Sequence, residues 1–160
     1  MGEASSITGF IVIVILYLAI GFLAAAGSIC ISRRIFKPKA EQTFYGLFLI
    51  AIAGFYLAFT AYLGTEAAWR LEGAAVLVFA ALGLIGTRLP FALIVGYSLH
   101  GLWDILHELH AHGAAAVFQP HQATAIPLAY GFFCLAYDFC LAAYSYWRRN
   151  DWTASESKAR

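Results

Sequence analysis

Residues 98–112 hold six ionisable side chains within fifteen positions of an apolar chain. The stretch reads Ser98-Leu99-His100-Gly101-Leu102-Trp103-Asp104-Ile105-Leu106-His107-Glu108-Leu109-His110-Ala111-His112 and holds four of the five histidines. An apolar run from Leu89 leads directly into it, so we expect these side chains on a helix that enters a bilayer. Ionisable groups at that depth are costly and by default indicate function. The stretch therefore indicates where the chemistry lies, without naming a reaction.

The composition excludes an ordinary soluble domain. Hydrophobic residues make up 62% of the 160 residues and charged residues 12%, against about 45–50% and about 25% in soluble domains. Several apolar runs approach the ~20 residues that cross a bilayer. A formal net charge of +1 leaves no basic face for a nucleic-acid partner. We therefore expect an all-α, polytopic membrane helix bundle.

The apolar runs predict five transmembrane helices. With the amino terminus outside and the carboxyl terminus cytoplasmic, nine of the ten Lys and Arg residues fall on the cytoplasmic side and only Arg70 lies outside, as the positive-inside rule favours. Localisation in a bacterial inner membrane, with several passes, follows from this reading. The predicted spans are about Thr8–Ser32, Thr43–Leu63, Leu71–Thr87, Leu89–Leu109 and Ile126–Trp147.

The spans define one predicted domain and a tail. Residues 1–149 form the five-helix transmembrane domain, and the polar residues 150–160 have no periodicity and are predicted to be disordered. The third and fourth spans are expected to form a tight hairpin, with Pro90 in the first turn of the fourth helix. No charge lies between Glu72 and Arg88, so the third span is predicted to be scaffold.

Helical geometry places the polar residues of the fourth span on one face. With His100 at 0°, Asp104 lies near +40° and His107 near −20° at ~100° per residue. Glu108 and His110 flank this face at roughly +80° and −80°. Asp104 can share a ligand with either histidine, because side chains three or four residues apart are neighbours. The two histidines are roughly 10.5 Å apart in rise, so one ion would not easily bind both.

The fifth span supplies a second carboxylate at a similar depth. Counting residues along the two antiparallel spans places Asp138 and His100 both near the midplane. An aspartate at that depth must face the interior and find a partner; His100 is the first candidate and Asp104 the second. Further interior-lining candidates are Tyr56, Thr60, Tyr130, Cys134 and Tyr137.

These residue types are those of a metal site. Imidazole and carboxylate suit zinc, with iron or copper as alternatives. Asp104 or Glu108 could instead act as a general base. The same residues could also form a buried hydrogen-bonded network that joins two helices, or relay protons or ions. The predicted metal ligands are His100, Asp104, His107, His110 and Asp138, and the predicted catalytic residues are Asp104 and Glu108.

Two segments carry a resemblance to a known family. The helix His100-x-x-Trp103-Asp104-x-x-His107 and the following Cys134-x-x-x-Asp138 are similar to those of an uncharacterised family of small bacterial integral membrane proteins, classed as a domain of unknown function. The resemblance implies a fold of four to five spans with the motif residues facing inward. It implies no established activity. The family often has a second histidine after the position of His107, where this chain has Glu108.

Together these observations predict an intramembrane His/Asp site that binds a divalent metal, with zinc as the first choice. If the protein is an enzyme, we expect a metal-dependent hydrolase acting on a lipid-like small molecule that enters from the bilayer. The alternatives are a small proton or metal-ion transporter or channel subunit, and a structural membrane subunit without metal. The lipid bilayer is the expected partner, and a homo-oligomer is compatible with the sequence.

Overall fold

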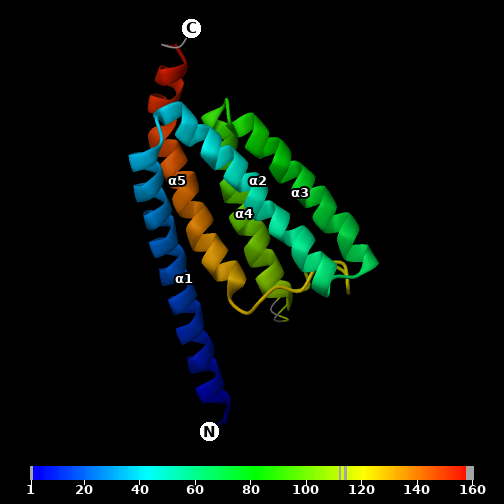
Figure 1. Cartoon of the computed structure of the whole chain (residues 1–160). Coiled ribbons are helices and arrows are strands. Elements are labelled where there is room, and N and C mark those ends of the chain that lie inside the picture. Colours follow the sequence, from blue (N-terminus) through cyan, green and yellow to red (C-terminus); the bar gives the residue numbers. More distant parts are fainter. Residues whose placement is uncertain (1, 112, 114, 158–160) are drawn as a thin grey trace.

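The protein, seen here as a computed structural model, is a bundle of five helices (Figure 1). The structure describes residues 2–111, 113 and 115–157, and the side chains of 7–111, 113 and 115–154. No strand occurs among these residues, so the predicted all-α architecture is confirmed. The helices are α1 (Gly2–Ile35), α2 (Pro38–Leu63), α3 (Glu66–Gly86), α4 (Pro90–Ala111) and α5 (Tyr130–Ser157).

The length and apolar composition of three helices indicate a membrane protein. Residues 7–35 of α1, together with α2 and α3, are long and apolar enough to cross a bilayer by length and composition. Helices α4 and α5 carry the buried His100, Asp104 and Asp138 and lie beside these apolar helices. That α4 and α5 also span the membrane, and that the amino terminus lies outside, remain predictions.

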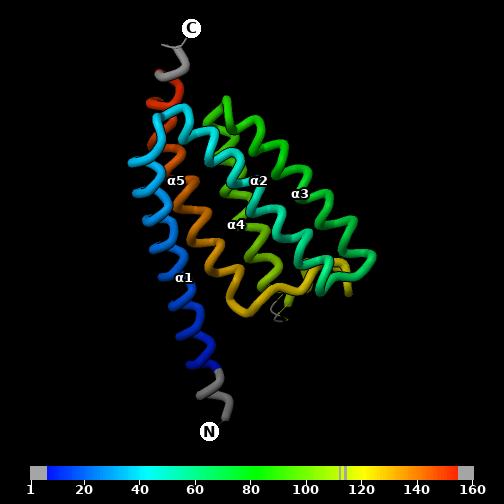
Figure 2. The backbone as a smooth tube through the Cα atoms, in the orientation of Figure 1, coloured from blue at the N-terminus to red at the C-terminus, as the bar shows by residue number. Residues whose placement is uncertain are grey.

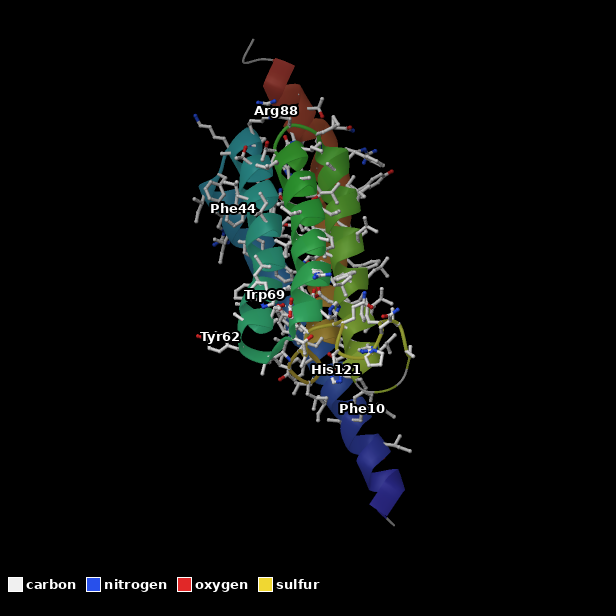
Figure 3. The ribbon with its side chains drawn as sticks, turned by 90° about the vertical axis from the view of Figure 1, so that its right-hand side faces the viewer. Phe10, Phe44, Tyr62, Trp69, Arg88 and His121 are labelled. Carbon is white, nitrogen blue, oxygen red and sulfur yellow. The ribbon has the colours of Figure 1, made fainter. Side chains whose placement is uncertain are left out.

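The arrangement places α4 and α5 side by side and antiparallel, as predicted. Helices α2 and α3 form a hairpin, α1 packs along α5, and α3 packs on α4 (Figure 1). Residues 115–129 cross one end of the bundle between α4 and α5 (Figure 2). Figure 3 shows Arg88 near the end that holds the carboxyl terminus, whereas Tyr62 and His121 lie toward the opposite end. The bundle therefore has a basic end and an end covered by the loop.

Two glycines allow α4 and α5 to approach closely. A Cβ atom at Gly131 would lie 2.5 Å from the carbonyl oxygen of Asp104, which no real side chain tolerates. A Cβ atom at Gly101 would lie 3.2 Å from the Cβ of Asp138. The backbones of α4 and α5 therefore lie close together at Gly101 and Gly131. This close approach brings Asp104 and Asp138 together.

The hairpin between α3 and α4 is as tight as predicted. Helix α3 ends at Gly86 and α4 begins at Pro90, where proline loses no helical hydrogen bond. The predicted disordered tail is wrong over 150–157, because α5 continues to Ser157 and Trp152 is fully buried. Residues 158–160 of the predicted tail lie outside the described residues. No finding tests the domain boundary at 149.

Glu41 explains why α5 extends so far. Its carboxylate is fully buried and accepts hydrogen bonds from the Tyr144 hydroxyl (2.5 Å) and the Trp152 indole N–H (3.0 Å). The Arg148 guanidinium donates to the same carboxylate from Nε (3.2 Å) and Nη2 (3.0 Å). Ser32 on α1 donates to it as well, at 3.1 Å. One side chain of α2 therefore joins α1 and the end of α5.

This geometry makes Glu41 important for stability. We expect Glu41→Ala to lower the stability of the bundle by about 3 kcal/mol, because several buried donors lose their acceptor together. The melting temperature of the purified protein in detergent should fall by roughly 5–10 °C. Glu66→Ala, at an exposed glutamate, is the matched control. An unchanged melting temperature in the Glu41 variant would contradict this role.

Candidate functional site

The centre of the bundle holds an imidazole between two carboxylates. His100 Nδ1 lies 2.8 Å from Asp138 Oδ2 and 2.9 Å from Asp104 Oδ2. All three side chains are at most 1% exposed. The contact with Asp138 has hydrogen-bond geometry, so Nδ1–H donates to that carboxylate. The structure thus brings together His100, Asp104 and Asp138, as the depth argument predicts.

Asp104 is held from α2 on one side and incompletely satisfied on the other. The Tyr56 hydroxyl donates to Asp104 Oδ1 at 2.5 Å. Within the described part of the chain, neither Asp104 Oδ2 nor His100 Nε2 has a hydrogen-bond partner, although both atoms are buried. The imidazole packs edge-to-face on Phe79, with ring centroids 4.9 Å apart. Buried polar atoms without partners are costly, and here two of them belong to one cluster.

This cluster could hold a metal ion. His100, Asp104 and Asp138 each offer one ligand atom, and the three atoms lie within 4.8 Å of one another. The donor set of one imidazole nitrogen and two carboxylate oxygens suits a divalent metal. A cation there would bind the Asp104 oxygen that accepts no hydrogen bond and would offset the charge of two carboxylates in an apolar interior. The residues therefore fit a metal.

An apolar pocket of about 380 Å³ reaches this cluster between α2 and α5. His100 and Asp138 form part of its wall, together with Cys134 and Tyr130. Phe55 also lines the pocket and is 54% exposed, so the pocket opens on the lateral face of the bundle. The remaining wall residues are Phe48, Ile52, Phe59, Phe133 and Tyr137.

His107 belongs to a second buried pair and not to the central cluster. Its Nδ1–H donates to the carbonyl oxygen of Trp103 (3.0 Å), and its Nε2 lies 2.8 Å from Glu72 Oε1. Because Nδ1 already carries a proton, a further proton must lie between Nε2 and the carboxylate for this contact to be a hydrogen bond. The Thr124 N–H also donates to Glu72 Oε1, at 3.0 Å. The pair ties α3, α4 and the loop together.

Glu108 caps a helix. Its Oε1 accepts the N–H of Ala129 (2.8 Å) and its Oε2 accepts the N–H of Gly131 (2.9 Å). Negative charge is favourable at a helix amino terminus, and α5 begins at Tyr130. Glu108 thus holds the start of α5 and does not belong to the cluster of His100, Asp104 and Asp138. Its catalytic role stays a prediction.

The remaining histidines lie toward the loop. His110 Nδ1 accepts the N–H of Phe118 at 3.4 Å, and the two rings pack together. His110 is therefore not brought into the cluster, contrary to its prediction as a ligand. His121 is exposed, with a positive φ of 62°, and His112 lies outside the described residues.

Two contacts of the site were not predicted. Glu72 was predicted to belong to a scaffold helix, yet it is fully buried against His107. A lone glutamate near the start of an apolar helix is the signal that could have identified it. Tyr56 was predicted to line the interior, and the structure shows that its hydroxyl contacts Asp104.

The sequence profile of a family of unknown function, DUF6010, matches residues 13–151, and the chain belongs to this family. The predicted membership of an uncharacterised family is thereby confirmed. Comparison with curated proteins and with solved structures gives no match.

The capping role of Glu108 can be tested directly. We expect Glu108→Gln to weaken the start of α5, because an amide offers one acceptor oxygen where the carboxylate offers two. Hydrogen exchange at the amides of Ala129 and Gly131 should accelerate by roughly tenfold, which corresponds to about 1.4 kcal/mol. Glu66→Gln should leave these amides unchanged. Unchanged exchange in the Glu108 variant would rule out the cap.

Proposed function

We propose that this member of the family is an integral membrane protein that binds a divalent metal at His100, Asp104 and Asp138. We further propose that it acts as a metal-dependent hydrolase on a lipid-like substrate. Zinc is the first choice, with iron and copper as alternatives. The observation that carries the proposal is the apolar pocket that runs from the lateral face of the bundle to His100 and Asp138.

Charge supports the metal. Two ionised carboxylates in one buried cluster repel each other, and a single imidazole cannot neutralise both. A divalent cation would balance them and bind the Asp104 oxygen that accepts no hydrogen bond. Three protein ligands leave a coordination position for water or substrate, as in catalytic metal sites.

The chain's own residues would position the reactants. Tyr56 holds Asp104 through its hydroxyl, so the carboxylate keeps one orientation while its other oxygen faces the cluster. The pocket walls would exclude bulk water and align an apolar chain beside His100. A metal bound there would supply Lewis acidity toward a carbonyl group and activate water.

The same proposal includes a location. We propose a multi-pass protein of a bacterial inner membrane with its amino terminus outside, because nine of the ten Lys and Arg residues then face the cytoplasm. Arg88 lies near the same end of the bundle as the carboxyl terminus (Figure 3), which supports this distribution. A homo-oligomer is compatible with the large apolar surface of α1.

A proton or metal-ion transporter subunit is a second candidate, favoured by one observation. Buried polar side chains also lie between the cluster and the basic end, beginning with Tyr97 one helical turn before His100. The Tyr97 hydroxyl donates to the carbonyl oxygen of Tyr45 (2.8 Å), whose own hydroxyl lies 2.8 Å from Ser32 Oγ. Ser32 in turn donates to Glu41. Proton or metal flux into proteoliposomes above that of empty vesicles would favour this candidate over the hydrolase.

Metal content tests the first proposal. We expect elemental mass spectrometry to find about one zinc or iron per wild-type chain, and Asp104→Asn or Asp138→Asn to lose it, because each removes one of three ligands. Tyr56→Phe should lower metal affinity or the hydrolysis of a fluorogenic long-chain acyl ester by about 10–100-fold. Asp151→Asn, at an exposed aspartate, is the matched control.

Two results would contradict the proposal. A folded wild-type protein that takes up no metal after resupply has no metal centre. A protein that keeps its metal but hydrolyses no acyl ester or amide is not a hydrolase.

A further inference from the structure

Aromatic contacts bound the pocket between α2 and α5 at both ends. Toward the loop, Phe59 and Tyr130 meet edge-to-face with ring centroids 5.3 Å apart. Toward the basic end, Phe48 packs against Tyr137 at 6.1 Å. All four residues line the pocket. These ring contacts narrow the pocket along the helix axes, and the exposed Phe55 marks its opening on the lateral face.

The entrance lies deep in the expected bilayer. His100 stands near the middle of α4, roughly 15 Å from either helix end at ~1.5 Å per residue. The hydrocarbon core is ~30 Å thick, so the pocket faces the acyl chains. The wall of α2 runs from Phe48 to Phe59, about 16 Å along the helix. This length suits an extended apolar chain.

The charges of the pocket oppose an anionic or zwitterionic headgroup. No Lys or Arg is among the described residues that line it. Its polar end presents the buried carboxylate of Asp138, with Asp104 directly behind His100. A phosphate would find no Lys or Arg in the pocket lining to pair with, and a divalent cation at the cluster would already be balanced by the carboxylates of Asp104 and Asp138. Burial of a charged headgroup in this pocket is therefore strongly unfavourable.

We propose that this pocket takes an uncharged lipid, an acyl ester or amide without a phosphate or other charged headgroup. Such a molecule dissolves in the hydrocarbon core, so its carbonyl can reach the depth of His100. The carbonyl of a phospholipid is held near the headgroups. The choice of substrate class rests on the proposed function, whereas binding of the lipid does not require hydrolysis.

Photolabelling of the full-length protein in nanodiscs tests this assignment. The probe is a diacylglycerol with a diazirine on one acyl chain, compared with phosphatidylglycerol and phosphatidylcholine that carry the same chains. We expect the diacylglycerol to label peptides covering 48–59 and 130–138 at least roughly tenfold more strongly than either phospholipid. An excess of unlabelled diacylglycerol should remove this labelling.

A pair of variants separates the pocket from the general lipid surface. Ile52 lines the pocket and is partly buried, so Ile52→Trp should fill it and abolish the labelling. Leu77→Trp, on an exposed face of α3, should label as wild type. The comparison of lipids in wild-type protein needs no variant and stands if the Ile52 variant fails to fold.

The outcomes separate this inference from the proposed function. Equal labelling by the phospholipids, or no diacylglycerol labelling of these peptides, would overturn the inference even if the protein hydrolysed another lipid. Selective labelling by diacylglycerol without hydrolysis would support the inference and contradict the proposed hydrolase activity.

Discussion

The bundle depends on the burial of carboxylates in an apolar interior. Five of the nine acidic residues are at most 1% exposed: Glu41, Glu72, Asp104, Glu108 and Asp138. A buried carboxylate is tolerable only if donors or cations reach it. Each of these five has at least one hydrogen-bond partner on a segment other than its own helix. The order in which the helices pack follows from these pairings as much as from apolar contact.

The carboxylates differ in how fully they are satisfied, and this difference separates structure from chemistry. Both oxygens of Glu41 and of Glu108 accept from donors held in place by other elements. Asp104 has one oxygen without a hydrogen bond, next to an imidazole that is also incompletely bonded. Natural proteins rarely leave such groups at their centre without a use. A ligand or metal bound at the cluster of His100, Asp104 and Asp138 would therefore satisfy buried polar atoms that lack hydrogen bonds.

Much of this arrangement could be predicted from single residues. Apolar length gives five helices, and depth along two antiparallel spans pairs His100 with Asp138. That Asp104 contacts His100 and not His107 could not be predicted, because helical spacing allows both contacts. Glu72 decides it by occupying His107 from α3. Long-range partners of this kind have no local signature.

Residues 150–157 also depend on a long-range partner that the local sequence does not reveal. Residues 150–157 lack periodicity, yet Trp152 is buried because Glu41, far away in sequence, offers an acceptor. Glu108 was predicted to be catalytic from its position beside the histidines. Its function as a cap depends on the position of Ala129 and Gly131 after the loop. The sequence pattern of α4 does not predict that position.

The cap formed by Glu108 also makes the position of Asp138 relative to His100 independent of the length of the loop between α4 and α5. Glu108 fixes the first turn of α5 one helical turn beyond Asp104, and Gly131 locks the backbones there. Asp138 then follows by counting along a rigid helix. Related chains could lengthen or shorten the connection before Thr124 and keep the cluster in register. One residue inserted between Gly131 and Asp138 would turn the carboxylate by about 100° away from His100.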